Sequence, residues 1–399
     1  DRAVADTFGS GLGFIDPLYM LAEEVMGTRS GHIWVMDLSN RTLYEAVDLG
    51  QGSWENAVPI NTGRTDTIAI MLSEDAGRSD TGVNPLQLYV GSKVPGSSDF
   101  LERNGLAGGT IYYWHADSGL TNGTVTSPSP GIFSSGNGTV VPGNWSTTAA
   151  GAVLFSKSED LHPNMDRDSK GYGIEVALAS ENQAVFLVDC SDLAFTAGDL
   201  AGGARNSDIT VLYAESTQAA TNPFGDMDNL TWSADGLIYV NEDDQEGDIW
   251  VIDPASLLSD YATSDFTPSA AQVYEILDAD FVKESSGIID VSADLDFAPG
   301  SIFLTSGQQS SPRSANQIAM CVSPTATRLE DVFDNWILGF PALNTPAKRL
   351  PTADPDDDGL DNQTEFALAL PPDVSNPGSP LTVIRGTSHT EVSFTPGQS

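Results

Sequence analysis

Acidic residues recur at alternate positions in the stretch DPDDDGLDNQTE, residues 354 to 365. The stretch matches the calcium-loop pattern D-x-D-x-D-G-x5-E, in which side-chain and main-chain oxygens surround one ion and a glycine permits the sharp turn. The predicted ligands are Asp354, Asp356, Asp358, the Leu360 carbonyl, Asn362 and Glu365. The sequence therefore predicts a calcium site that orders a linker, and the alternative is a solvated acidic segment.

A second set of acids, with one amide, lies beside apolar runs, where a protein rich in strands seldom places a charge. The set contains Glu23, Glu24, Glu55, Glu74, Asp75, Glu159, Asp160, Asp228, Asn229, Glu242, Asp243 and Glu284. Each member alone also fits a solvated turn residue. Their chemistry depends on whether the fold brings them together, because clustered carboxylates favour an oxygen-lined site for a hard cation.

The elements that position these acids are predicted to be short strands. Runs of four to eight residues rich in Val, Ile, Tyr and Trp recur along the chain, as in GHIWVMDL (31–38), PLQLYVGSK (85–93) and GLIYVNEDD (236–244). Gly, Asp, Asn and Ser bound these runs, which is typical of strands joined by turns. Helical periodicity is expected only in LEDVFDNWIL (329–338) and in the segment after the calcium loop.

Strands without intervening helices favour a sandwich, a barrel or a propeller, so the predicted fold class is all-β. A length of about 340 residues favours a six-bladed β-propeller of four-stranded blades. In a propeller the inner strand ends meet at one mouth of the channel. Carboxylates that meet there repel one another unless cations are bound, so the fold predicts a calcium site in the channel.

Changes in composition divide the chain into three predicted parts. Residues 1–341 form the propeller, with a Gly-, Ser-, Thr- and Asn-rich excursion at about 117–150. Residues 342–378 form a linker that contains the calcium loop, and residues 379–399 begin a further β segment. We expect this segment to lead into another small domain or an anchor.

The charge balance restricts the partners. The chain has 56 acidic residues against 17 basic ones, a formal charge of −39. Such a surface repels nucleic acid and anionic membranes, so neither is an expected partner. No stretch approaches the roughly 20 apolar residues of a membrane span, so direct membrane insertion is not expected. The acidity and the calcium loop favour a secreted, extracellular or cell-surface protein, with the bacterial periplasm as an alternative.

The order of several short pieces resembles one protein family. The pieces include MLAEEVMGTRSGHIWVMDL (20–38), VDLGQGSWENA (47–57), SEDLHPN (158–164), MDNLTWSADGLIYVNEDD (227–244) and ESSGIIDVS (284–292). Their order over roughly residues 14 to 310 resembles the PhoX-type alkaline phosphatases and the wider secreted family that shares their domain. The resemblance implies a six-bladed propeller whose channel mouth holds calcium and iron ions that cleave phosphate monoesters.

Carried over by position, the resemblance implies metal ligands at Glu24, Glu55, Asp228, Glu242 and Glu284, and with less direct matches at Glu23, Glu74 and Glu159. Glu24 and Glu284 are also its candidate catalytic residues, and Lys283 is a candidate contact to the phosphate. The cysteine iron ligand of the family falls at Ala22, which cannot bind metal. We therefore expect calcium at the propeller site, as in the tail loop, and not iron.

Three functions fit these features. The first is a calcium-dependent phosphoesterase that acts on a small phosphate ester. The second is a non-catalytic, calcium-stabilised module that binds a cell-surface component, and the third is a lactonase- or esterase-type propeller with one catalytic calcium. A Ser-His-Asp triad has little support, because only His162 among the four histidines lies in a motif-like stretch.

Overall fold

The structure is a computed structural model of residues 1–399. It describes the chain except for residues 1, 4, 10, 26–28, 76–82, 124–130, 134, 181–183, 204, 215–223, 244–246, 265, 278–283, 309–316, 368–369, 376–380, 386–389 and 395–399. The chain divides into two compact units, which we describe separately. The first contains residues 1–291 and 302–322, and the second contains residues 292–301 and 323–399.

The first unit is built from antiparallel sheets, five of which have three or more strands among the described residues. The first sheet has the order β1 (Arg2–Ala3), β2 (Leu18–Ala22), β3 (Ile33–Asp37), β4 (Thr42–Glu45). The second has the order β11 (Gly143–Ser146), β9 (Thr110–Ala116), β8 (Gln87–Ser92), β6 (Thr67–Glu74), β5 (Trp54–Ile60). The third has the order β10 (Val140–Val141), β18 (Asp208–Ala214), β15 (Ala184–Asp189), β14 (Glu175–Ser180), β13 (Ser158–Pro163).

The remaining two large sheets follow in chain order. The fourth has the order β19 (Met227–Trp232), β20 (Ile238–Glu242), β21 (Ile249–Ile252), β22 (Val273–Leu277). The fifth has the order β23 (Glu284–Asp290), β24 (Ile302–Gln308), β25 (Gln317–Val322). Two small pairs complete the unit, β7 (Val83–Pro85) with β12 (Leu154–Ser156), and β16 (Phe195–Thr196) with β17 (Asp199–Leu200).

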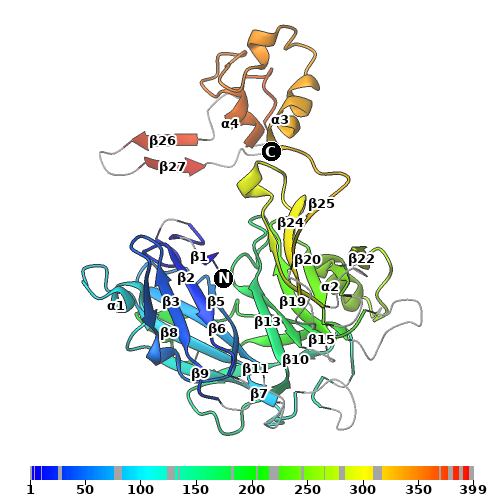
Figure 1. Cartoon of the computed structure of the whole chain (residues 1–399). Coiled ribbons are helices and arrows are strands. Elements are labelled where there is room, and N and C mark those ends of the chain that lie inside the picture. Colours follow the sequence, from blue (N-terminus) through cyan, green and yellow to red (C-terminus); the bar gives the residue numbers. More distant parts are fainter. Residues whose placement is uncertain are drawn as a thin grey trace. The chain divides into compact units, whose positions relative to one another are not determined.

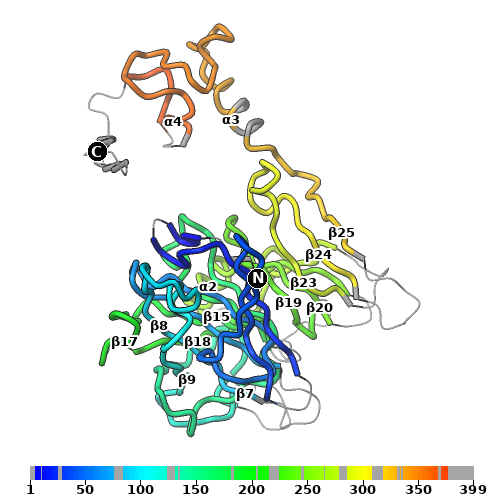
Figure 2. The backbone as a smooth tube through the Cα atoms, turned by 60° about the vertical axis from the view of Figure 1, so that its left-hand side comes forward, coloured from blue at the N-terminus to red at the C-terminus, as the bar shows by residue number. Residues whose placement is uncertain are grey.

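The five large sheets are arranged as the blades of a β-propeller, in chain order from blue to yellow (Figure 1). One strand of each blade contacts the corresponding strand of the next, in the series β2, β5, β13, β19 and β23. Figure 2 shows the last of these contacts, where β23 lies beside β19 and β20. The prediction of an all-β propeller is confirmed, whereas the described residues form five blades and do not confirm a sixth.

Apolar side chains fill the space between blades. A strand that is covered on both faces has a continuous apolar sequence, because its side chains are buried on either side. All eight residues of β6 are buried. Between the second and third blades, the Phe133 and Phe186 rings lie 4.9 Å apart and the Phe155 and Phe186 rings 5.6 Å apart. Such aromatic pairs add about 0.5–1.5 kcal/mol each beyond the burial of their area, so this cluster fixes neighbouring blades together.

Two short helices of the first unit were not predicted. They are α1 (Phe100–Asn104) and α2 (Pro254–Ala262). The Asp253 carboxylate accepts from the Ser256 N–H at 3.0 Å at the start of α2, and Pro254 occupies the first turn. An acid followed by proline is a helix start signal, so the expectation of helix only near the carboxyl end was wrong.

The expected excursion at 117–150 is only partly irregular. Its described residues include β10, which extends the third blade, and β11, which extends the second. Its glycine-rich composition concealed these strands, because glycine and serine weaken strand signals.

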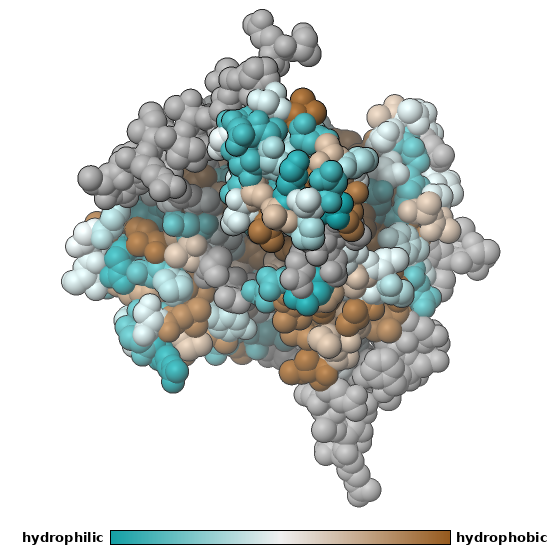
Figure 3. Space-filling model, turned by 90° about the horizontal axis from the view of Figure 1, so that it is seen from above, coloured by the Kyte–Doolittle hydropathy of each residue, from teal (hydrophilic) through white to brown (hydrophobic). Residues whose placement is uncertain are grey.

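Polar and apolar residues are interspersed on the face of the molecule that Figure 3 shows. Exposed apolar side chains alternate along β25 at Ile318, Met320 and Val322. Alternate residues share one face of a strand, so these three form an apolar strip on the strand that ends the fifth sheet.

The second unit contains α3 (Leu329–Leu338), α4 (Asn362–Ala367), the 3₁₀ helices η3 (Ala293–Leu295) and η4 (Pro346–Arg349), and a hairpin of β26 (Leu381–Arg385) and β27 (Thr390–Phe394). Its core consists of Phe333, Ile337 and Leu343, with aromatic residues packed around them. The predicted helix at 329–338 is confirmed with the same bounds. Among the described residues, no helix is both long and apolar enough to cross a membrane.

Candidate metal site on the inner strands

We call β2, β5, β13, β19 and β23, which contact one another from blade to blade, the inner strands. Four of these five strands contain a β-bulge, and three of the bulges contain acids. The residues that the bulges release from regular pairing are Glu55 on β5, Glu159 with Asp160 on β13, Asp228 with Asn229 on β19, and Gly287 on β23. A bulge redirects the side chain of the extra residue and often lies next to a functional site. The repeated bulge therefore explains how separate strands present acids at matching positions.

Three carboxylates form the centre of this arrangement. Glu24 follows β2, Glu55 lies on β5 and Asp75 follows β6, and each offers an oxygen within 4.8 Å of the others. The charges of Glu159 and Asp228 act on Glu55 as well, so these two acids lie close to it. We call these five residues the inner-strand cluster; they come from four consecutive blades.

The electrostatics of the inner-strand cluster are those of acids without enough positive charge. Burial, followed by the charges of Glu159 and Asp228, raises the pKa of Glu55 well above its usual range. Burial and the charges of Asp228 and Asp75 raise the pKa of Glu159 to about 9. Burial and Asp75 also raise the pKa of Glu24. Without a cation the cluster must therefore hold protons, and a divalent ion would replace them.

One basic side chain partly balances these charges. The Lys157 Nζ lies 3.3 Å from a carboxylate oxygen of Glu159. One ammonium cannot balance five acids, so among the described residues most of this negative charge is uncompensated.

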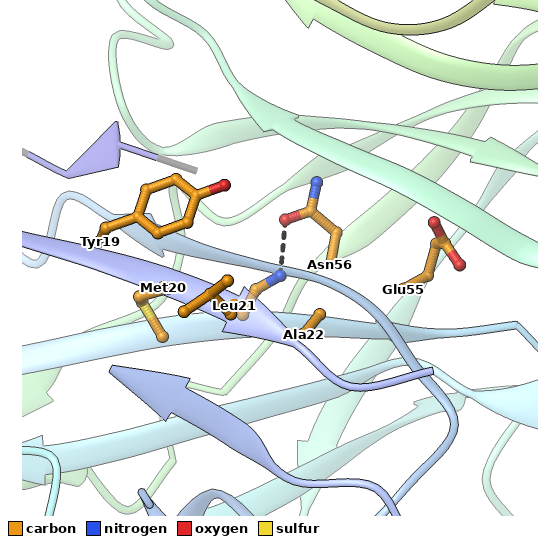
Figure 4. A pocket seen from close by; sticks show the side chains of 7 residues that line it. Tyr19, Met20, Leu21, Ala22, Glu55 and Asn56 are labelled. Carbon is orange, nitrogen blue, oxygen red and sulfur yellow. Dashed lines mark hydrogen bonds between the residues drawn. The ribbon is translucent and has the colours of Figure 1, made fainter. Parts of the chain in front are cut away.

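A cavity of about 210 Å³ adjoins the cluster. Its lining consists of Tyr19, Met20, Leu21, Ala22, Glu55, Asn56 and Ala57 (Figure 4). Both Glu55 and Ala22 line this space, so Ala22 lies beside the acids. The Asn56 side chain folds back to accept from the Ala57 N–H at 2.6 Å.

Asp160 has a structural role distinct from that of Glu159. Its carboxylate accepts from the Leu230 N–H at 2.9 Å, from the Leu161 N–H at 2.7 Å, and from the Asn56 amide. These donors lie on β19, β13 and β5. Because burial outweighs the hydrogen bonds, the pKa of Asp160 rises to about 7. Asp160 thus connects three inner strands next to their bulges.

Two predicted ligands are engaged by donors of the protein. Glu74 is buried and accepts from the Arg29 guanidinium at 2.8 Å and from the Gln87 amide at 2.6 Å. Glu23 is exposed and accepts from the His32 N–H at 3.0 Å. In each pair of adjacent acids, Glu23–Glu24 and Glu74–Asp75, the second member joins the cluster. Asp75 was missed as a ligand because sequence alone does not distinguish the two members.

Of the other predicted residues, Glu242 accepts hydrogen bonds from the protein, and the side chain of Glu284 and the whole of Lys283 are not described. The Glu242 oxygens accept from the Gly225 N–H at 2.7 Å and from the Trp250 indole at 2.9 Å. Glu284 is the first residue of β23, and its side chain lies outside what the structure describes. Lys283 lies entirely outside the described residues. The roles assigned to Glu284 and Lys283 stay predictions.

His162 is partly buried near the bulge of β13, and its Nδ1 lies 2.9 Å from the Pro163 carbonyl. Burial lowers the pKa of His162 to about 4, so the imidazole is neutral at physiological pH. It contributes no positive charge to the inner-strand cluster.

The predicted tail loop forms a second acidic group within the second unit. Asp354, Asp356 and Asp358 each offer an oxygen within 4.8 Å of the others. Glu365 on α4 and Asn362 are buried, as is Leu360. The three acids that the motif spaces two residues apart are thus close together in the structure.

A comparison with known protein families finds no family that matches this chain, and a comparison with characterised proteins finds no match either.

Proposed function

We propose that the protein hydrolyses small phosphate monoesters with the help of calcium held by the inner-strand cluster, as its resemblance to the PhoX-type phosphatases implies. The main support is the convergence of Glu24, Glu55, Asp75, Glu159 and Asp228 from four consecutive blades. Three of these acids lie at bulges and two at strand ends, and five acids in one place can bind a cation.

The residues present fit calcium. The donor set consists of carboxylate oxygens, which hard cations prefer, and Ala22 supplies no thiolate for a softer metal. Bound calcium would supply positive charge for an anionic ester in a protein that otherwise repels it. The pKa values of Glu55 and Glu159 are raised because these buried acids repel one another when no ion is bound.

Glu24 is the best placed of the five acids to act as a base. It is exposed, whereas Glu159 is buried, so it can meet a water molecule and an incoming ester. Glu24 would accept the proton of the attacking water, and the water oxygen would form the new bond to phosphorus. The leaving alkoxide would take a proton from solvent as its own bond to phosphorus breaks.

We also propose a sixth blade and a role for Glu284 next to the ester, as the resemblance implies. The loop motif, the acidity and the place of Lys283 beside Glu284 further suggest a calcium module in the tail, a location outside the cell and a contact of Lys283 to the phosphate. An extracellular location would provide the calcium concentration that such sites require.

A second candidate is a non-catalytic propeller that calcium stabilises and that binds a cell-surface component. The ion pair between Lys157 and Glu159 favours it, because this ammonium already balances an acid and is not held ready for a phosphate. Ala22 favours it too, because it lacks the metal-binding thiolate of the phosphatases.

Metal analysis combined with hydrolysis of p-nitrophenyl phosphate tests the proposal. The wild-type chain should retain calcium after dialysis and hydrolyse the ester, and Glu55→Gln should lose both the inner ion and at least tenfold of the rate. Glu275→Gln, on the outer strand β22, is the matched control and should change neither. Retained calcium without hydrolysis of several monoesters would support the second candidate, and absence of the inner ion would contradict both.

A further inference from the structure

The acidic loop of the second unit is shaped from within by its own backbone. The Asp354 carboxylate accepts from the Gly359 N–H at 2.9 Å, and the Asp358 carboxylate accepts from the Leu360 N–H at 2.8 Å. Gly359 has φ +93°, a left-handed conformation that glycine adopts without strain. The loop therefore turns sharply and directs the oxygens of Asp354, Asp356 and Asp358 to one place.

A buried carboxylate faces this place. Glu365 has no exposed surface, and neither of its oxygens has a hydrogen-bond partner among the described residues. The charges of Asp356, Asp358 and Asp354 act on this carboxylate, so it lies close to the loop acids. A buried and unpartnered carboxylate beside three other acids is very unfavourable unless a cation joins them.

The residue after Glu365 belongs to the aromatic core of the second unit. The Phe366 ring lies 5.7 Å from the Phe333 ring, edge to face, and 5.2 Å from the Trp336 ring. Phe333 and Trp336 lie on α3, and Phe366 lies on α4. Because adjacent residues of a short helix move together, a shift of Glu365 away from the loop acids would also displace Phe366 from α3.

Asn362 fixes the start of α4 through hydrogen bonds to the segment that precedes the loop. Its amide donates to the Lys348 carbonyl at 2.8 Å and to the Leu350 carbonyl at 2.7 Å. These bonds hold the start of α4 against η4 and the residue that follows it. Asn362 therefore positions the loop, in addition to its predicted part as a ligand.

We propose that a divalent cation bound by Asp354, Asp356, Asp358 and Glu365 closes the contact between α4 and α3, so that ion binding and packing of Phe366 form one coupled step. Calcium is the natural occupant because all four ligands are carboxylates in a flexible loop. Without the ion, repulsion drives Glu365 towards water and takes Phe366 away from Phe333 and Trp336. The inference concerns the second unit alone and does not depend on the proposed phosphoesterase function.

Hydrogen exchange of the full chain tests the coupling. In EDTA, amides of residues 329–338 should exchange at least tenfold faster than with calcium, because α3 loses its partner. Glu365→Gln should abolish the calcium response, and Asp357→Asn is the matched control. Asp357 lies in the same loop, is exposed and has φ 59°, which asparagine tolerates, so this variant should respond as the wild type does. Equal exchange with and without calcium in the wild type would overturn the proposal.

Calorimetry supplies a second test that removes no ligand. In a Glu55→Gln background, which isolates the tail ion, Phe366→Ala should weaken calcium binding about tenfold, because coupling between packing and binding is reciprocal. An unchanged calcium affinity would show that the loop binds the ion independently of α3 and would overturn the coupling. Loss of the calcium response in Asp357→Asn would instead overturn the assignment of the four ligands.

Discussion

Neighbouring acids in this chain have different roles, and their hydrogen bonds reveal which is which. Glu74 is held by Arg29 and Gln87, whereas Asp75 offers an oxygen to the group that it forms with Glu24 and Glu55. The sequence identified both acidic pairs but chose Glu74 as a ligand. The direction of a side chain at the end of a strand depends on the residue at which hydrogen-bonded pairing stops. The spacing of residues in the sequence does not reveal that residue.

Asp75→Asn and Glu74→Gln should therefore have opposite consequences. Asp75→Asn should weaken calcium binding at the inner-strand cluster with little effect on stability. Glu74→Gln should lower the free energy of unfolding by about 1–3 kcal/mol, because it removes a buried charged acceptor of Arg29. Calcium titration and urea unfolding of the two variants measure these effects, and the reverse pattern would show that Glu74 is the ligand.

Ala22 offers a direct test of the resemblance at the level of one residue. Ala22 lines the same cavity as Glu55. A thiolate there would add a soft ligand beside the oxygen donors, so Ala22→Cys should raise the iron content of protein loaded with ferrous iron. Metal analysis against Ala22→Ser, which adds no thiolate, measures the effect. Equal iron in the two variants would place residue 22 outside the metal site.

At the scale of elements, alternation and composition predicted the strands, and the structure confirms the all-β propeller. The bulges could not be predicted, because a bulge is a property of pairing between two strands. Glu55 and Asp228 were nevertheless found as candidates from their place in apolar runs. Helix α2 was missed, although Asp253 and Pro254 supply a start signal, because its nine residues give too short an apolar period.

Asp160 tests whether the bulges are held in place from within. Asp160→Ala would leave the Leu230 N–H, the Leu161 N–H and the Asn56 amide without their buried acceptor. We expect a loss of about 2–5 kcal/mol in the free energy of unfolding, together with weaker calcium binding. Urea unfolding measures the first effect. Asp199→Ala, on the β16–β17 hairpin, is the surface control and should cost less than about 1 kcal/mol; an equal loss in both variants would contradict the role of Asp160.

At the scale of the whole molecule, the buried acids should make the free energy of unfolding fall as the pH rises. The folded state raises the pKa of Glu159 to about 9, while an unfolded glutamate ionises near 4.5. The unfolded state thus binds fewer protons between these values, and stability falls as pH rises. His162, with a pKa lowered to about 4, opposes this trend only below about pH 6.5 and has no effect above it.

We therefore expect Glu159 to make the metal-free protein lose up to about 1.4 kcal/mol of stability per pH unit as the pH rises from 6.5 towards 9. Calcium replaces the protons, so the loss should disappear when it is present. Urea unfolding in EDTA and in calcium at constant ionic strength measures both slopes. Stability that rises with pH in EDTA would show that these acids are not held together in solution.

The central claim is that acids on consecutive inner strands hold a calcium ion. Anomalous diffraction from a crystal grown with terbium, which replaces calcium among oxygen ligands, tests it most directly. We predict a peak about 2.3–2.6 Å from carboxylate oxygens of Glu24, Glu55 and Asp75, and a second peak at the loop of Asp354, Asp356 and Asp358. A peak at the loop alone, with the inner-strand cluster empty, would contradict the claim, because the loop shows that the ion was present and available.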